Sequence, residues 1–300
     1  MRDRVLLGLS AALLFVGLVV WTLQSRDAGL DEERRRYVET LRDPPPLGTD
    51  LHPADPRGTA AADAFRRAGL GDAPLRFFFT RGETAIVGAG VEGRDALEVW
   101  SALRAVAHET HLFPVILGDG FSVERHGDAV LHTMTPVEAT LARASDLDLD
   151  AWLAARPEPA AGSAMPVAPR TEHFVSVLDP VLGVPVMPVA VALFPVARAA
   201  DVPAWLAFGN WHECPEAAVH VAVLRRLEDE AHVELVAITS DRIELRVPSP
   251  PTDAAARDRL AGLLARWDVP AFAADRATIA SWSATVVPSR SWSLSFPRPH

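Results

Sequence analysis

V-M-P-V-A-V-A-L-F-P-V, from Val186 to Val196, is a nearly continuous apolar run with a proline close to each end. Such a run is typical of a strand that is covered on both faces, because a half-buried strand alternates apolar and polar residues. Proline cannot donate a hydrogen bond inside a central ladder. We therefore predict a buried strand over Val189 to Phe194, with the rest of the fold built around it.

A helix and a hairpin are predicted after this strand. Apolar residues recur at helical spacing from Pro215 to Glu230, so one face of a helix is expected to pack inward. His232 to Thr239 and Arg242 to Val247 are separated only by Ser240 and Asp241, which favours an antiparallel hairpin. A shorter helix over Val202 to Phe208 is expected between the buried strand and this unit.

Further elements are predicted on both sides of this region. The Pro/Ala-rich segment Arg156 to Arg170 indicates a loop or a break between two subdomains. The sequence therefore predicts an α+β domain over residues 59–300, whose mixed sheet carries a C-terminal antiparallel hairpin packed by helices. The additional predicted strands are Leu75–Thr80, Thr84–Val87, Phe113–Leu117 and Ser291–Phe296, and the additional predicted helices are Thr59–Leu70, Arg94–His108, a capping-box start at Thr135–Glu138, Asp146–Ala155 and Ala254–Trp267.

The N-terminal segment is predicted to anchor the chain in a membrane. Val5 to Leu23 contains no charged residue and would span about 28 Å as a helix, close to the ~30 Å hydrocarbon core. A cleaved signal peptide is the alternative, but its apolar region is usually shorter. We predict one transmembrane helix in residues 1–24, a charged helix and Pro-rich spacer in residues 25–58, and a single-pass protein whose domain is extracytoplasmic.

Composition excludes some classes of partner. The formal net charge of −10 argues against binding to nucleic acid, whose phosphates attract basic proteins. Apolar residues make up 49% of the chain, enough for a sizeable core. The chain has 1 cysteine, so an internal disulfide is excluded.

A resemblance to a known family follows from three segments. G-N-W-H-E-C-P from Gly209, H-V-A-V-L-R from His220, and the hairpin sequence ending in P-S-P-P at Pro251 resemble the bacterial domain of unknown function 4253 family. The likeness is strongest over Gly209 to Pro251, and the family-like region covers about residues 175–300. The family carries a second Cys-Pro segment after the proline pair, which is missing from this chain. The resemblance implies a fold and no activity.

Cys214 is the candidate nucleophile. His212 lies two residues before it and His220 six after, and a neighbouring imidazole lowers the pKa of a thiol. A hydrolase or transferase that uses Cys214 with His212 or His220 is therefore one alternative. The other interpretation is a buried cysteine that packs at the start of a helix. The spacing matches no familiar zinc pattern, so no metal site is predicted.

Our leading hypothesis is a domain that binds a protein partner or a small ligand rather than catalysing a reaction. Trp211, His212 and Glu213 cluster in a turn, and binding residues are frequent in loops. Trp205 is a further candidate for the ligand-binding set. The alternative for both tryptophans is packing in the core.

A glycine motif suggests a third hypothesis, a dinucleotide-binding enzyme. Gly88, Gly90 and Gly93 match the dinucleotide fingerprint between a predicted strand and a predicted helix. No acidic residue ends the next strand at the spacing that the fingerprint requires, and lone glycine motifs often mark turns. We therefore predict no cofactor.

Overall fold

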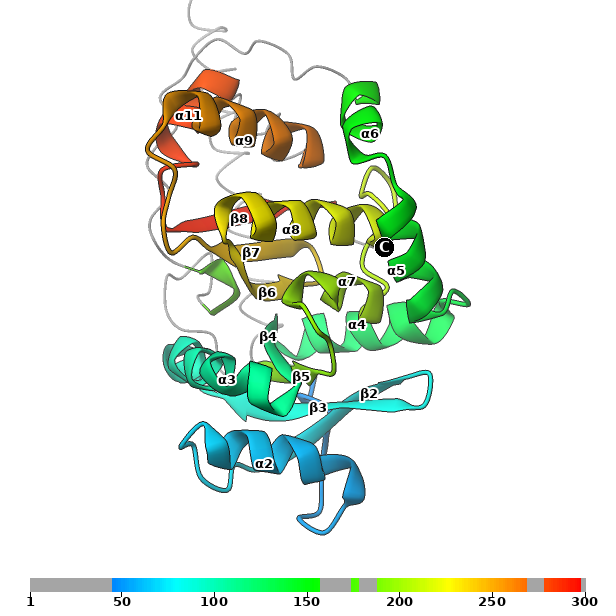
Figure 1. The fold of residues 1–300 in the computed structure, drawn as a ribbon. Helices are drawn as coiled ribbons and strands as arrows, with labels where there is room; N and C mark the ends of the chain where they lie inside the picture. The colour runs from blue at the N-terminus through cyan, green and yellow to red at the C-terminus, as the bar shows by residue number, and fades with distance from the viewer. Residues whose placement is uncertain (1–44, 157–173, 178–187, 269–277, 298–300) are drawn as a thin grey trace, which may run out of the picture. The chain divides into compact units, whose positions relative to one another are not determined.

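One eight-stranded sheet runs through the residues that the computed structural model describes, which are 45–156, 174–177, 188–268 and 278–297 (Figure 1). Its strand order is β1-β2-β3-β5-β4-β6-β7-β8. Neighbouring strands are antiparallel except β4 and β6, which run parallel. The strands are β1 (Thr49–Asp50), β2 (Leu75–Arg81), β3 (Thr84–Val91), β4 (Phe113–Gly118), β5 (Val189–Phe194), β6 (Glu234–Thr239), β7 (Arg242–Arg246) and β8 (Ser291–Ser295).

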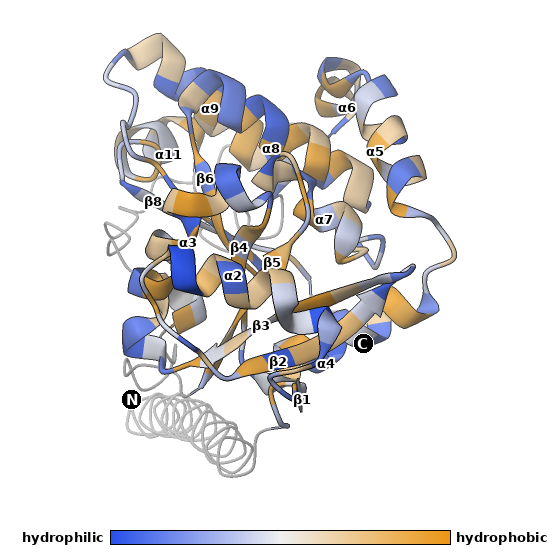
Figure 2. Ribbon diagram, turned by 60° about the horizontal axis from the view of Figure 1, so that its bottom comes forward, coloured by the Kyte–Doolittle hydropathy of each residue, from blue (hydrophilic) through white to orange (hydrophobic). Residues whose placement is uncertain are grey.

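Helices cover both faces of the sheet. The α-helices are α2 (Thr59–Arg67), α3 (Ala96–Thr110), α4 (Gly120–His132), α5 (Val137–Asp146), α6 (Leu149–Ala155), α7 (Val202–Trp205), α8 (Ala217–Ala231), α9 (Ala254–Trp267) and α11 (Ile279–Thr285). Short 3-10 turns are η1 (Pro56–Gly58), η2 (Gly93–Asp95), η3 (Val175–Val177) and η4 (Ala199–Asp201). Figure 2 shows the central strands β4 and β5 in hydrophobic colours and hydrophilic residues on α3 and α9.

The predicted buried strand is confirmed as β5, and its burial explains its composition. All of its residues are buried, and it pairs with β3 on one edge and β4 on the other. Alternate side chains enter two cores: Val191 packs with residues of α2 and α3, while Ala192 packs with residues of α8 and α9. Because neither face meets water, the strand contains no polar residue.

The predicted hairpin and the two long C-terminal helices are also confirmed. β6 and β7 pair in antiparallel register, with Thr239 opposite Arg242 at the turn. α9 has the predicted bounds, and α8 begins two residues after Pro215. The fold is therefore a mixed α+β arrangement, as the sequence indicates, and its sheet is mostly antiparallel.

Several predicted boundaries differ from the structure. Thr135 does not form the predicted capping box, because Pro136 takes the extended N-cap position without a side-chain cap and the helix begins at Val137. α7 ends at Trp205 instead of continuing to Phe208, because Ala207 adopts a positive φ of 47°. The helix predicted from Asp146 begins only at Leu149, where Asp148 caps it through Ala151 N at 2.9 Å.

Three elements were not predicted. Residues 49 and 50, inside the predicted spacer, form β1 and pair with β2. α4 follows β4 directly, and α11 precedes β8. Gly127 lies within α4 and lowers its helix propensity, which hides the helix from pattern reading.

The predicted N-terminal anchor at Val5 to Leu23 and the charged helix after it lie outside the described residues. None of the helices that the structure describes is long and apolar enough to cross a membrane. Most of the predicted break at Arg156 to Arg170 also lies outside the described residues. β5 follows that segment and lies between β3 and β4, so strands from both sides of it share one sheet. The described residues from Pro45 onward form one compact unit.

Candidate functional site

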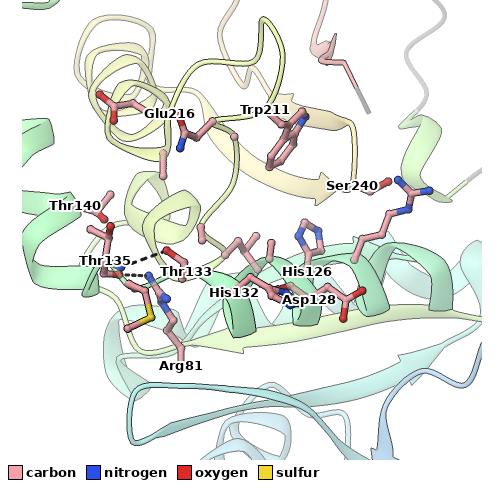
Figure 3. A pocket seen from close by; sticks show the side chains of 18 of the residues that line it. Arg81, His126, Asp128, His132, Thr133, Thr135, Thr140, Trp211, Glu216 and Ser240 are labelled. Carbon is pink, nitrogen blue, oxygen red and sulfur yellow. Dashed lines mark hydrogen bonds between the residues drawn. The ribbon is translucent and has the colours of Figure 1, made fainter. Parts of the chain in front are cut away.

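A pocket of about 900 Å³ opens beside the turn from Gly209 to Trp211 (Figure 3). This volume lies within the ~300–1,000 Å³ range of small-molecule sites. Its walls come from the end of β2, from α4 and the linker after it, from α5, from the end of α7, from the first turn of α8 and from the β6–β7 turn. The lining residues are Arg81, Phe121, Glu124, Arg125, His126, Asp128, Ala129, His132, Thr133, Met134, Thr135, Thr140, Arg143, Leu206, Ala207, Gly209, Asn210, Trp211, Glu216, Ala217, Ala218 and Ser240.

Arg81, the last residue of β2, is a buried cation in this pocket. The residue is 7% exposed, and its Nη2 donates to the carbonyl oxygens of Thr135 at 2.8 Å and Ala204 at 3.4 Å. Its Nε is buried without a hydrogen-bond partner among the described residues. Burial lowers the pKa of Arg81, and the charge of Glu138 opposes that shift. The guanidinium stays protonated, as arginine does throughout the physiological range.

The α4 wall is fixed to the sheet by buried polar contacts. Asp119 caps the helix by accepting a hydrogen bond from Ser122 N at 3.0 Å, and Ser122 Oγ accepts one from Ser240 N at 2.6 Å. His126 Nε2 lies 2.9 Å from the carbonyl oxygen of Ile238, which can only accept, so this nitrogen carries the proton. Burial lowers the pKa of His126 to about 4, and the ring is neutral at pH 7.

The opposite wall is a strained turn that positions Trp211. Gly209 has φ +102°, and a Cβ there would lie 1.9 Å from the carbonyl oxygen of Pro215, so the position requires glycine. Asn210 N donates to the same carbonyl at 3.0 Å. Trp211 Nε1 donates to the carbonyl oxygen of Pro297 at 2.5 Å, and its ring meets Phe208 edge to face at 5.3 Å. The indole is therefore held in one orientation by these two contacts.

The start of α8 completes the pocket. Glu216 is the N-cap residue but makes no side-chain hydrogen bond to the helix. Its carboxylate instead pairs with Arg143 of α5 at 2.9 Å. The first-turn residues Ala217 and Ala218 line the pocket with small side chains. The positive end of the α8 dipole consequently faces the pocket.

Cys214 and His220 lie together, but away from the pocket lining. Sγ of Cys214 is 3.5 Å from Nε2 of His220, and both residues are buried. Trp267 Nε1 donates to Nδ1 of His220 at 3.1 Å. An indole N–H can only donate, so Nδ1 is the unprotonated nitrogen and Nε2 carries the proton. His220 therefore presents an N–H to the sulfur and has no lone pair there to accept the thiol proton.

The ionisation of this pair also disfavours nucleophilic chemistry. Burial raises the pKa of the Cys214 thiol to about 12, and the negative charge of Asp268 acts in the same direction. Burial lowers the pKa of His220 to about 3. Both groups are neutral at pH 7, whereas a catalytic pair needs a thiolate or a base that can generate one.

The three glycines of the predicted fingerprint do not form a phosphate-binding loop. Gly88 and Gly90 lie inside β3 and pair with Ala192 and Ala190 of β5, while Gly93 begins η2. A Cβ at Gly88 would lie 2.0 Å from the carbonyl oxygen of Val191. Gly88 thus permits the close approach of β5, and the loop that the dinucleotide hypothesis needs is absent at this place.

The Gly209–Pro215 turn and the β6–β7 hairpin both lie in a segment that matches a known family model. Residues 190–295 match the family model described as Domain of unknown function (DUF4253). This DUF4253 match confirms the resemblance in the C-terminal part of the chain. It spans β5 to β8 with α7, α8, α9 and α11, so it includes the turn wall of the pocket but neither α4 nor Arg81. No curated protein and no solved structure matches the chain.

The predicted binding residues of the DUF4253 segment are separated in the structure. Trp211 lines the pocket, whereas His212 and Glu213 are exposed outside its lining. Trp205 is half-buried against the core. In the part of the chain that the structure describes, no group of three or more His, Cys, Asp or Glu residues is placed to hold a metal ion.

Sequence reasoning missed Arg81 and the α4 wall, which precede the DUF4253 segment. The signal for α4 was Asp119 as an N-cap before apolar residues at Val123 and Val130, interrupted by Gly127. Arg81 has no local signal, because it occupies an ordinary position at the end of a strand. Its acceptors, Thr135 and Ala204, lie 54 and 123 residues further along the chain.

Proposed function

We propose that this protein binds a small organic molecule in the pocket between α4 and the first turn of α8. The observation that carries the proposal is the pocket itself, a concave space of about 900 Å³ whose lining combines charged and polar side chains with apolar ones. Ligand sites are typically concave, with apolar surface for the body of the ligand and placed polar groups that orient it. Trp211, Leu206 and Arg81 are the leading members of these two sets.

A small ligand is favoured over a protein partner. Leu131, 75% exposed, and Met134, 93% exposed, are the large apolar side chains that the described surface exposes. Two such side chains make no extended apolar patch of the kind that marks protein interfaces. The concave surface is therefore the stronger argument, and it favours a molecule that enters it.

Catalysis by Cys214 receives no support from the geometry. The thiol is buried, its proton cannot pass to the protonated Nε2 of His220, and neither residue lines the pocket. Binding without covalent chemistry at Cys214 is consequently the function that the site supports best.

We also propose that Val5 to Leu23 holds the domain at a membrane, with the domain on the extracytoplasmic side. The support is the length of this segment without a charged residue. Deletion of residues 1–24 should move the protein from the membrane fraction to the supernatant after cell lysis. Recovery of the full-length protein in the supernatant would contradict the anchor.

The test of the pocket compares two matched variants. Ala217, the first residue of α8, lines the pocket, whereas Ala254, the first residue of α9, is exposed elsewhere. A library of small metabolites is screened against the full-length protein by ligand-observed NMR. We expect Ala217→Trp to fill the pocket and weaken the hits at least about tenfold, because lost contacts of ~1.4 kcal/mol change affinity by that factor. Ala254→Trp should leave them unchanged.

Unfolding midpoints of both variants establish that each is folded before binding is compared. Hits that bind Ala217→Trp and the unmodified protein equally would place the ligand elsewhere and refute the assignment. A library without a single hit would refute the proposed function itself.

A further inference from the structure

We propose that the ligand of this pocket is a small organic acid whose carboxylate binds between the guanidinium of Arg81 and the first turn of α8. This inference rests on the proposed function, since it names the chemical class that the same pocket would accept. Three features of the pocket carry it: an unpaired buried cation, a helix start without a side-chain cap, and a fixed aromatic ring.

Arg81 is the buried cation, and it lacks a carboxylate partner. Less buried arginines elsewhere in the structure have one: Arg225 pairs with Asp201 and Arg198 with Glu228, both at 2.8 Å. No Asp or Glu oxygen within the described ranges lies within 4.0 Å of the Arg81 guanidinium. Buried charges are normally paired, because removal from water costs several kcal/mol. An anionic ligand would supply the missing partner.

The geometry of the guanidinium directs this partner into the pocket. Nη2 is engaged by the carbonyl oxygens of Thr135 and Ala204, which hold the side chain in one orientation. Figure 3 shows Arg81 on one side of the pocket, with Glu216 and Trp211 across the space from it. Arg81 lines the pocket, and Nη1 makes no hydrogen bond to a described residue. Nη1 and Nε are therefore the donors of Arg81 that no described residue engages.

The start of α8 contributes a second favourable field. Ala204, whose carbonyl accepts from Arg81, packs in one small apolar cluster with Ala218 of the first turn of α8. Glu216 does not cap the helix and is paired with Arg143, so its carboxylate leaves the first-turn amides without a side-chain acceptor. Uncapped amides at a helix start favour an anion, and here they adjoin the same pocket as the buried guanidinium.

A carboxylate fits this site better than a phosphate. Glu124 and Asp128 of the α4 wall also line the pocket, and their charges would repel a dianion more than a monoanion. Trp211 offers a rigid apolar surface for the body of the ligand.

The experiment uses four probes that share one ring and differ in the charged group: benzoate, benzamide, phenyl phosphate and benzylamine. Dissociation constants are measured by ligand-observed NMR titration of the full-length protein at pH 7. We expect benzoate to bind on the order of tenfold to a hundredfold more tightly than benzamide, since a hydrogen bond to a charged group stabilises by ~1.5–3 kcal/mol. Phenyl phosphate and benzylamine should bind more weakly than benzoate.

Variants assign this preference to Arg81. Arg81→Gln should reduce benzoate binding to the level of benzamide while leaving benzamide unchanged, and Arg81→Lys should keep part of the preference. Arg94→Gln is the matched control, because Arg94 is exposed, carries the same charge and lies outside the pocket lining. The comparison of probes on the unmodified protein needs no variant, so a poorly folded Arg81 variant does not remove the test.

The outcomes separate the two proposals. Equal affinity for benzoate and benzamide, tighter binding of phenyl phosphate, or an unchanged preference in Arg81→Gln would overturn the carboxylate assignment. If neutral probes or library hits still lose affinity in Ala217→Trp, the proposed binding function stands even though the carboxylate assignment fails. If no compound is sensitive to Ala217→Trp, both proposals fail.

Discussion

Iodoacetamide should alkylate Cys214 far more slowly in the folded protein than in the unfolded chain. The thiolate is the reactive form, and burial raises the pKa of the Cys214 thiol to about 12. At pH 7 about 1 in 100,000 folded molecules would then carry the thiolate, against about 3 in 100 for an ordinary thiol with a pKa of ~8.5. The difference is about 3,000-fold in rate, before any steric protection.

The assay follows alkylation by intact-protein mass spectrometry, in native buffer and in denaturant, between pH 7 and pH 10. The rate in denaturant should level off above pH ~9, when the unfolded thiol has ionised. The rate in native buffer should continue to rise about tenfold per pH unit, because the folded thiol is still protonated. Steric protection alone would slow alkylation in native buffer but would leave its plateau at pH ~9. The shape of the pH–rate profile therefore separates steric protection from a raised thiol pKa.

The free energy of unfolding should also depend on pH through the Cys214 thiol. A folded pKa above the unfolded one means that the folded state retains a proton that the unfolded state loses, so the contribution of Cys214 to stability is complete below pH ~8.5 and is lost as pH rises towards 12. The decrease should reach about 1.4 kcal/mol per pH unit and disappear in Cys214→Ala. Fast native alkylation with a plateau well below pH 8.5 would refute this reasoning and favour the Cys214 nucleophile.

Three further predictions concern stability. Gly88→Ala should destabilise the fold by about 2 kcal/mol or more, because its Cβ would meet a backbone oxygen of β5 at 2.0 Å. Gly127 lies in α4, and a Cβ there would meet no other atom within 4 Å, so Gly127→Ala should stabilise the fold by roughly 0.5–1 kcal/mol. Equal changes in the free energy of urea unfolding for Gly88→Ala and Gly127→Ala would contradict the packing argument. Burial lowers the pKa of His126 to about 4 and that of His220 to about 3, so their contribution is present above pH 6.5 and is lost as pH falls. Unfolding free energies at pH 7 and pH 5 should differ by on the order of 2 kcal/mol for each histidine, and an unchanged value would show that these rings are not held neutral. Trp267→Phe should cost about 1–3 kcal/mol, because Nδ1 of His220 loses its donor, and a smaller loss would indicate that another donor reaches that nitrogen.

Local sequence patterns predicted much of the fold. The apolar run predicted β5, and the two-residue gap between alternating strands predicted the β6–β7 hairpin, because burial on both faces and tight turns leave direct signatures in the sequence. α4 was missed because Gly127 weakens its pattern. The glycine motif was misleading for a related reason: strand packing and phosphate loops both require residues without a Cβ.

The sequence predicted only part of the candidate site. The turn that carries Trp211 was predicted as a binding region, and it forms one wall of the pocket. Cys214 and His220 were predicted as neighbours, and they are 3.5 Å apart. Their protonation, however, depends on Trp267, 47 residues beyond His220, and on burial that no local pattern reports.

The sequence by itself determined the buried strand, the hairpin, the long C-terminal helices and the resemblance of residues 190–295 to the DUF4253 model, since each depends on residues close together in the chain. The tertiary structure decided where the pocket lies and which charged groups line it. Arg81 meets its acceptor Ala204 across 123 residues, and the pocket around it exists only when β2, α4 and α8 pack together. Burial and pairing are properties of that packing, so the pKa of a thiol, an imidazole or a guanidinium is fixed only by the folded chain.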